Sequence, residues 1–338
     1  MTMTRRTVLT AALSAGAAFT LAGPAAAAPG AVPQTLAALD PANIRFPIGY
    51  LGLTWTGDQP PTSVRFRTVS GWGAWQPVPH GDSHGVLIPA GGALSYELRG
   101  DGVRAIAINT TDGSPVQPYA ASGGGLSIPG VRYLSRAAWG ADESLRFGPD
   151  GTELFPPAYF PVQTLTVHHT VTDGTDPAAV VRAIYFFHTV TQNFGDIGYH
   201  LLIDQAGTVY EGRWSGTDPI PVFQGARTGD GTPRMSNGAH TGGFNAGNVG
   251  VALLGDLTSV QPTAAARRSL IAVLATLAKL TRRDPLGTVA YVNPISGATK
   301  TVNTISGHRD WLATECPGEA FYPALPGIRQ AVAALVGR

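Results

Sequence analysis

The sequence predicts a small all-β, sandwich-like domain followed by an α/β domain with a mixed central β-sheet flanked by helices. Between residues 44 and 111, short alternating apolar and polar runs lie between turn signals, with no helical periodicity. Residues 120–125 are rich in glycine and alanine, which is typical of a linker. Beyond residue 131, strand-like runs alternate with helical periodicity, the pattern of an α/β domain.

Composition agrees with two compact domains and excludes several function classes. The chain has 338 residues, and a domain usually takes roughly 100–200. Only 13% of the residues are charged and the net charge is +1, so a basic nucleic-acid binder is not expected. With 43% hydrophobic residues the chain can form a core, and its 43 glycines and 27 prolines predict many turns.

The first residues predict an export signal. Arg5 and Arg6 precede a mildly apolar run that ends in small residues, and the paired arginines are typical of the twin-arginine type. The run is too short and too rich in alanine and glycine for a transmembrane segment. We therefore expect a signal peptide over residues 1–28, a linker over 29–42, and an exported protein that is extracellular or associated with the cell wall.

The β-sandwich-like domain is predicted over residues 43–119. Ser63–Val69 is a good example of its alternating runs. Three tryptophans in this domain, Trp55, Trp72 and Trp75, are either a platform for carbohydrate stacking or packing aromatics of a small β domain. The second interpretation is favoured, and the domain carries no recognisable catalytic motif.

The α/β domain is predicted over residues 131–338, after a linker at 120–130. The expected strands are Leu165–His169, Tyr199–Ile203, Thr208–Glu211 and Val249–Leu254. The expected helices are 176–191, 263–283 and 327–336, with a hairpin over 288–303 and a long loop over 213–239.

The one cysteine, Cys316, excludes an intrachain disulfide and needs another explanation, because an exposed thiol outside the cell is readily oxidised. His308 precedes it by seven intervening residues, and His168 and His169 end a predicted strand. Neighbouring strand residues point to opposite faces, so one of that pair is expected at the site. Two imidazoles and a thiolate suit Zn²⁺ with a fourth position open to water. The residues alone leave open a nucleophilic Cys316 with His308 as base and Asp310 as orienter.

Several motifs occur in the order of a known family. They are Arg136–Ala141, Val167–Thr170, Asp196–Ile203, Val209–Arg213, Gly238–His240, Asn248–Val251 with Gly255-Asp256, Gly307–Asp310 and Thr314–Gly318. Together they resemble the peptidoglycan recognition protein family, which shares its fold with the phage-lysozyme-type N-acetylmuramoyl-L-alanine amidases. The resemblance covers residues 131–337.

The resemblance implies a zinc-dependent enzyme. His168, His308 and Cys316 match the family's zinc ligands, and Tyr199 and Thr314 match its catalytic residues. Receptor-only members lose the cysteine ligand, so its presence implies cleavage of the amide between N-acetylmuramic acid and L-alanine. The implied partner is peptidoglycan or its muropeptides. The alternatives are a non-catalytic peptidoglycan-binding receptor and the cysteine/histidine hydrolase described above.

Other positions match the family less specifically. The candidate groove residues are His169, Asn193, Phe194 and His240. A related amidase family carries a glutamate where this chain has Ala252. The identity of the general base is therefore left open, and we expect an active site of the type that uses a tyrosine, here Tyr199. The sequence leaves the stem-peptide preference and the oligomeric state undetermined.

Overall fold

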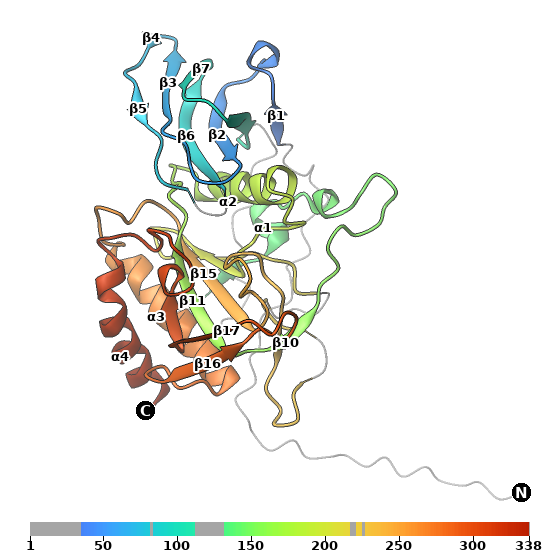
Figure 1. The fold of residues 1–338 in the computed structure, drawn as a ribbon, viewed down its shortest axis with the longest axis vertical. Helices are drawn as coiled ribbons and strands as arrows, with labels where there is room; N and C mark the ends of the chain where they lie inside the picture. The colour runs from blue at the N-terminus through green and yellow to red at the C-terminus, as the bar shows by residue number, and fades with distance from the viewer. Residues whose placement is uncertain (1–34, 82–83, 112–131, 217–220, 225–226, 338) are drawn as a thin grey trace, which may run out of the picture.

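The computed structural model describes residues 35–81, 84–111, 132–216, 221–224 and 227–337. The predicted signal peptide and the linker at 120–130 lie outside these residues. Figure 1 shows the β-rich N-terminal part at one end of the molecule and the helices and central sheet of the second part below it. Within the described residues, the helices are all too short or too polar to cross a membrane.

Residues 35–111, here called the β module, form two antiparallel sheets around an apolar core. One sheet has the strand order β1-β8-β2-β6, and the other has β4-β3-β5 with β7 also paired to β3. The core includes Leu51, Leu53, Val64 and Ile88, each 4% exposed or less. The strands are β1 (Leu36–Ala38), β2 (Ile48–Trp55), β3 (Ser63–Thr68), β4 (Gly71–Trp72), β5 (Gln76–Pro77), β6 (Gly85–Ala93), β7 (Ser95–Arg99) and β8 (Val103–Asn109), and a 3-10 turn covers Pro41–Asn43.

Two details of the β module differ from the sequence expectations. Strand β1 lies inside the segment predicted as a linker and pairs with β8. Such an edge strand is held by backbone hydrogen bonds, so it needs little apolar pattern. Trp55 is part of the core, whereas Trp72 is 41% exposed, so the three tryptophans do not form one surface.

The second part is built on a six-stranded sheet with the order β18-β11-β15-β12-β13-β9. Most neighbours are parallel, while β12 and β13 are antiparallel, which confirms the predicted mixed sheet. Its strands are β9 (Tyr133–Leu134), β11 (Thr164–His169), β12 (Leu201–Ile203), β13 (Val209–Glu211), β15 (Asn248–Leu253) and β18 (Ile305–Gly307). Two separate pairs are β10 (Tyr159–Pro161) with β14 (Arg234–Ser236) and β16 (Thr288–Val292) with β17 (Thr299–Asn303).

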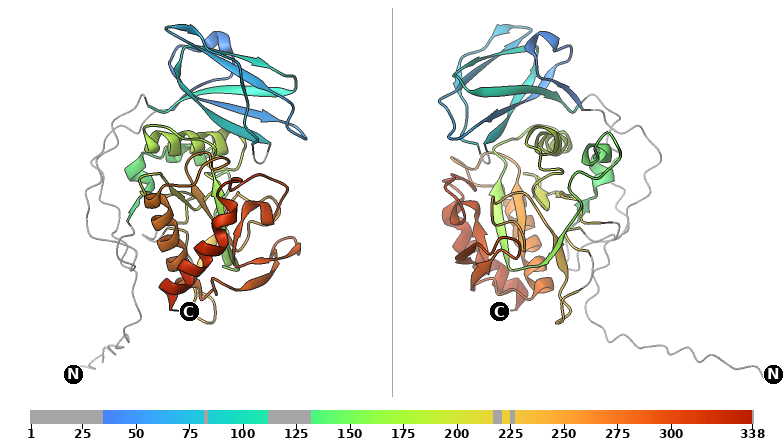
Figure 2. Two further views of the ribbon diagram at one scale, coloured as in Figure 1. Left: turned by 90° about the vertical axis from the view of Figure 1, so that its left-hand side faces the viewer. Right: turned by 45° about the vertical axis from the view of Figure 1, so that its right-hand side comes forward.

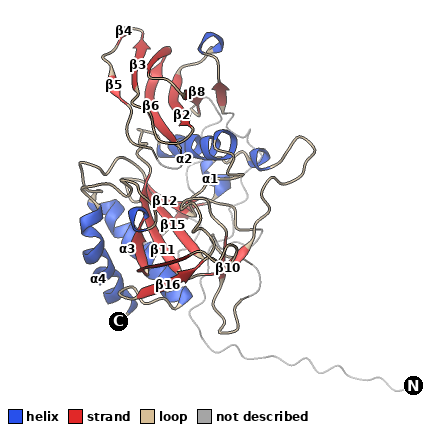
Figure 3. Ribbon diagram, in the orientation of Figure 1, coloured by secondary structure: helices blue, strands red, loops and turns tan. Residues whose placement is uncertain are grey.

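Helices cover both faces of this sheet (Figures 2 and 3). They are α1 (Arg136–Trp139), α2 (Pro177–Phe186), α3 (Ala264–Thr281) and α4 (Leu325–Val336). Leu165 and Val167 of β11 belong to the apolar cluster that contains α3 and α4. Because side chains alternate along a strand, His168 faces the opposite side, where α2 packs. The alternation therefore directs one histidine of the pair to the α2 side.

The β module packs directly on α2, which lies between it and the central sheet in the views of Figures 1 and 2. Leu87, Ile106 and Ile108 of the module share one apolar cluster with α2. Thr110 Oγ1 donates to Ala179 O at 2.8 Å, and Arg182 Nη2 donates to Thr110 O at 2.9 Å. These contacts fix the module against the second part of the chain.

Some elements of the structure were not predicted from the sequence, and one predicted helix ends at a different residue. The helix predicted over 176–191 ends as an α-helix at Phe186 and continues as a π-helical turn, Phe187–Thr191. Strand β14 lies within the predicted loop 213–239, and β18 was not predicted at all. Strands as short as these contain too few residues for an alternation of apolar and polar side chains to be recognised. The remaining short turns are 3-10 helices at Glu143–Arg146, His308–Asp310 and Tyr322–Ala324.

Candidate metal centre

The carboxyl ends of two parallel neighbouring strands bring the predicted ligands together. Strand β11 ends at His169, and β18 ends at Gly307, directly before His308. The loop that follows returns Cys316 to the same place. The ligand atoms of His168, His308 and Cys316 all lie within 4.8 Å of one another, and each residue is 2% exposed or less. The structure thus brings together all three ligands predicted from the sequence.

Hydrogen bonds decide which nitrogen of His168 is available to a metal. His240 Nε2 lies 2.9 Å from the carbonyl oxygen of Asn248, which can only accept, so this nitrogen carries the proton. His240 Nδ1 is therefore an acceptor, and it lies 3.0 Å from His168 Nε2. His168 must then donate through Nε2 and keep a lone pair on Nδ1. That nitrogen lies 3.6 Å from Cys316 Sγ, on the side of the other two ligands.

The same environment favours uncharged imidazoles. Burial, reinforced by His308 and His240, lowers the pKa of His168 well below its usual value. Burial and the neighbouring His200 likewise lower the pKa of His240. A metal ligand must be a neutral imidazole, so this histidine cluster is prepared for coordination without deprotonation at neutral pH.

The donor set fits Zn²⁺. Two nitrogens and one sulfur at the end of parallel strands leave a fourth position open, which is the arrangement of catalytic zinc sites. The backbone N–H of His169 donates to Cys316 Sγ at 3.4 Å, an interaction that stabilises a thiolate. Cys316 is buried, so its sulfur is protected from solvent.

Asp310 is engaged elsewhere. Its Oδ2 accepts a hydrogen bond from the backbone N–H of Gly307 at 2.8 Å, and its Oδ1 accepts from the hydroxyl of Tyr322. The carboxylate thereby shapes the turn on which His308 sits. This arrangement favours the metal-site interpretation over one in which Asp310 orients His308 as a base for Cys316.

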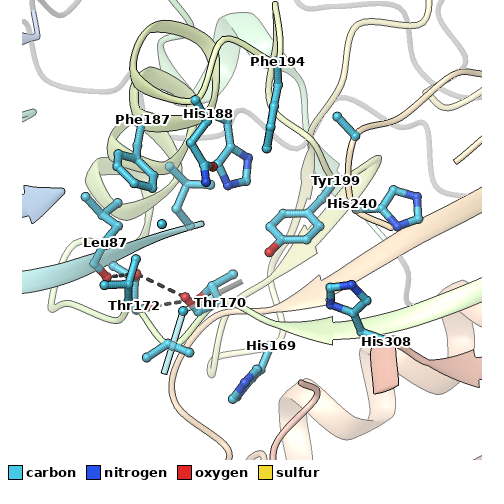
Figure 4. Close-up of a pocket in the computed structure, with 17 residues that line it drawn as sticks. Leu87, His169, Thr170, Thr172, Phe187, His188, Phe194, Tyr199, His240 and His308 are labelled. Carbon is cyan, nitrogen blue, oxygen red and sulfur yellow. Dashed lines mark hydrogen bonds between the residues drawn. The ribbon is translucent and has the colours of Figure 1, made fainter. Parts of the chain in front are cut away.

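A cavity opens beside the ligands, and Tyr199 lies on its wall (Figure 4). The rings of Tyr199 and His168 have centroids 5.2 Å apart. Figure 4 shows the Tyr199 hydroxyl pointing into the cavity, with His188 and Phe194 on the opposite side from His308. Tyr199 is thus within reach of a molecule bound next to the three ligands.

Thr314 lies beside a second cavity, of about 190 Å³, whose lining includes Cys316 and His169. The backbone N–H of Cys316 donates to Thr314 Oγ1 at 3.1 Å. This bond uses the Thr314 oxygen as an acceptor and ties the hydroxyl group to the backbone of a ligand residue. Thr314 therefore borders the metal centre on a side different from that of Tyr199.

The four groove candidates have different positions. His169 lines both cavities, and its Nδ1 accepts from the backbone N–H of Leu257 at 3.0 Å. Phe194 lines the first cavity. Asn193 lines neither cavity and has a φ of 57° in an exposed turn. His240 borders the first cavity but is 4% exposed, and its ring nitrogens are used by His168 and Asn248.

A buried ion-pair network holds the segment that carries Tyr199. Arg136 Nη1 contacts Asp196 Oδ1 at 3.0 Å, and their side chains are 3% and 5% exposed. Asp196 also accepts from the backbone N–H groups of Ile197 at 2.6 Å and Trp214 at 2.8 Å. Both charged residues lie in motifs quoted above, but their pairing was not predicted.

Residues of the β module at the cavities were also missed. Leu87 and Gly85 line the first cavity, and Pro79 and His80 line the second. No pattern in the sequence links this module to the metal ligands, because the two are separated by a long stretch of chain. Only the packing of the module on α2 brings them together.

Comparison with known proteins agrees with this site. Residues 158–319 match the family described as N-acetylmuramoyl-L-alanine amidase. A human N-acetylmuramoyl-L-alanine amidase is 33% identical over 172 residues, which cover 49% of this chain and 24% of the human protein. A peptidoglycan recognition protein of Trichoplusia ni is 31% identical over 167 residues, covering 48% of this chain and 72% of that protein.

Among solved structures, the crystal structure of the Drosophila peptidoglycan recognition protein SD is 25% identical, covers 58% of this chain and 93% of its own, and has a TM-score of 0.39. The chain thus spans about a quarter of the length of the human relative and nearly three quarters of the insect one. The matched region contains the three ligands of the metal centre. The chain belongs to the family of peptidoglycan recognition proteins and N-acetylmuramoyl-L-alanine amidases.

Proposed function

We propose that this chain is an exported, zinc-dependent hydrolase that cleaves the amide between N-acetylmuramic acid and L-alanine in peptidoglycan. The observation that carries the proposal is the convergence of His168, His308 and Cys316, whose ligand atoms lie within 4.8 Å of one another in a family that includes amidases. The paired arginines and the apolar run at the N-terminus support export.

These three residues would hold the zinc ion. Bound there, zinc would supply Lewis acidity for the scissile carbonyl and lower the pKa of a water molecule toward ~7. The protein's own contribution is to fix the ligands. His240 orients His168 through the 3.0 Å hydrogen bond, and the backbone of His169 supports Cys316 Sγ at 3.4 Å.

The positions of Tyr199 and Thr314 support the proposal that both are catalytic residues. The hydroxyl of Tyr199 points into the cavity beside the ligands and is suited to hold the attacking water. Thr314 lines the second cavity together with Cys316, and its hydroxyl group is suited to stabilise the negative charge that develops on the carbonyl oxygen. The bond that breaks joins this carbonyl carbon to the nitrogen of L-alanine.

The alternative is a receptor that binds peptidoglycan without cleaving it, and some relatives are named only as recognition proteins. The intact ligand set favours cleavage, because a receptor has no need to keep a buried thiol between two imidazoles. Release of free stem peptide from purified cell wall separates the two functions.

The proposal is tested by measuring zinc content and cleavage products together. The purified protein is expected to bind one equivalent of zinc, to lose activity with a chelator and to regain it with zinc. Cys316→Ser should lose most of the bound zinc and the activity in parallel. Full activity of Cys316→Ser after thorough chelation would contradict zinc dependence, and inactivation by alkylation of a zinc-free, active protein would favour the cysteine/histidine hydrolase.

Tyr199→Phe tests the proposed catalytic role of the hydroxyl. It should bind zinc normally but lower kcat about a hundredfold, the usual effect of removing one donor at the reacting centre. Phe194→Leu is a matched control in the same cavity that removes no polar group. Equal kcat values for Tyr199→Phe and the wild type would exclude the tyrosine from the reaction.

A further inference from the structure

The β module supplies part of the wall around the metal centre. The first cavity is lined by Gly85 and Leu87 of the module together with Tyr199 and His308 of the second part. The second is lined by Pro79 and His80 together with Thr314 and Cys316. A molecule bound at the three ligands therefore touches both parts of the chain.

The loop that carries His80 is held in place within the module. Gln59 Nε2 donates to the carbonyl oxygen of Pro79 at 2.9 Å, and Gln59 Oε1 accepts from the backbone N–H of Gly81 at 2.8 Å. These two bonds hold the backbone on either side of His80. The His80 side chain itself is exposed and lines the second cavity.

A third hollow continues from His80 over the β module. It has a volume of about 550 Å³, and its lining includes His80, Gln59, Val78 and Arg99. His80 borders both this hollow and the cavity next to Cys316, so the two adjoin at this residue. The second cavity, which Cys316 lines, thus has at His80 a common border with a surface groove formed by the module.

Arg99 is the strongest recognition group in this groove. Its guanidinium lies 4.0 Å from the ring centroid of Trp75, a stacking contact that limits its motion. Among the described residues it has no hydrogen bond or ion pair, whereas the neighbouring Arg65 is bonded to Glu97 at 2.7 Å. The described residues that line the groove include no carboxylate, whereas the second cavity is lined by Asp256 and Glu315. An oriented, unneutralised guanidinium is suited to a carboxylate ligand.

We propose that this groove, with His80 at its entrance and Arg99 inside it, is a subsite for the carboxylate-bearing peptide of the substrate. The inference rests on the proposed function. In that substrate the lactyl carboxyl group of the sugar is already part of the scissile amide, so the free carboxylates belong to the peptide. The peptide begins at the scissile nitrogen and extends away from the metal centre, past His80, toward Arg99.

The test compares two soluble muropeptides, one with free peptide carboxyl groups and one in which they are carboxamides. Binding to the full, chelated protein is measured by calorimetry, and KM is measured with zinc. Arg99→Ala should weaken binding of the free acid about tenfold, the usual worth of a hydrogen bond to a charged group, and leave the carboxamide unchanged. Arg104→Ala, another exposed arginine of the module that does not line the groove, is the matched control.

His80→Ala should weaken the binding of both muropeptides, because it changes the entrance of the groove and leaves the charge of Arg99 in place. Equal affinities of Arg99→Ala and Arg104→Ala for the free acid would overturn the subsite while leaving the proposed function intact. Equal losses for acid and carboxamide in Arg99→Ala would show that the groove does not recognise the carboxylates and would overturn the proposed subsite. Absence of binding and cleavage in the wild type would overturn the proposed function and the subsite with it.

Discussion

His240 holds His168 in the orientation that the metal centre requires, and a glycine makes room for it. A Cβ atom on Gly250 of β15 would lie 2.7 Å from the His240 ring. The strand therefore cannot carry a side chain here without displacing the imidazole. The glycine in the motif Asn248–Val251 thus supports the metal centre from outside it.

Displacing His240 should weaken zinc binding without removing a ligand. His240→Ala and Gly250→Ala are each expected to lower zinc affinity by 10- to 100-fold, the usual cost of losing a partner of a ligating histidine. Competition with a chromogenic chelator measures this affinity. His188→Ala is the control, since His188 lines the same cavity but accepts a hydrogen bond from the backbone N–H of Gly198 at 3.0 Å. Unchanged affinity in both variants would contradict the orienting role.

His200 gives the protein a dependence of stability on pH. Burial lowers the pKa of His200 to about 4, and its Nδ1 accepts from the backbone N–H of Gly250 at 2.9 Å. In the unfolded chain its pKa is near 6.5. Between these values the unfolded state binds a proton that the folded state does not, so stability falls as the pH falls.

The folded protein should therefore lose about 3 kcal/mol through His200 as the pH drops from about 6.5 to about 4. His200→Asn keeps an acceptor for Gly250 but no longer titrates, so its stability should depend less on pH. Urea unfolding in the presence of a chelator measures the difference without a contribution from the metal. Parallel pH profiles for the wild type and the variant would contradict this assignment.

At the scale of elements, the ion pair of Arg136 with Asp196 joins α1 to the segment that leads into β12. Both side chains are buried, so neither charge can be compensated by water if its partner is lost. The pair therefore fixes the position of Tyr199, three residues after Asp196. This explains why the two sequence motifs containing Arg136 and Tyr199 occur in one fold.

Asp196→Asn should reduce the free energy of unfolding by about 2–3 kcal/mol, because the buried Arg136 guanidinium then keeps only Glu143, whose side chain is 39% exposed, as its ion-pair partner. Glu319→Gln is the matched control. Glu319 pairs with Arg309 at 2.8 Å, but the Glu319 side chain is 62% exposed, so the loss should be under about 1 kcal/mol. Urea denaturation measures both variants. Equal losses would show that burial does not strengthen the first pair.

Elements with long periodic patterns were predicted from the sequence, and those held by backbone pairing alone were not. The apolar stripe that includes Leu270 and Leu274 predicted a helix whose two ends lie within two residues of the ends of α3. The sequence also identified the three residues that the structure brings together as a candidate metal centre, since residue type and spacing indicate their chemistry. It did not identify His240's hydrogen bond or the contribution of His80, because such contacts depend on how distant segments pack.

At the scale of the whole molecule, the β module and the second part share one apolar cluster. On β2, Gly52 faces the Phe187 ring so closely that a Cβ atom would lie 2.7 Å from it. At Gly49 of the same strand, the nearest atom to a Cβ would be 3.5 Å away. The interface is therefore packed as tightly as a protein interior at Gly52, whereas a Cβ atom on Gly49 would make only an ordinary contact with the backbone of β8 within the module.

Heating should unfold both parts in a single transition, since neither can separate without exposing this cluster. Gly52→Ala should lower the Tm by several degrees through overpacking against Phe187, and Gly49→Ala should leave it nearly unchanged. Differential scanning calorimetry measures both. Two separate transitions in the wild type, or equal Tm values for the two variants, would contradict a shared core.

The Phe187 ring, packed against the backbone of Gly52, also bears on how other members of the family are organised. A relative that consists of the second part alone must expose this helix end to water, and a phenylalanine there would promote aggregation. Polar residues are therefore expected at this position in stand-alone relatives, and large apolar residues in those with a preceding domain. The residue type at the position of Phe187 would then distinguish relatives that have a preceding domain from those that lack one.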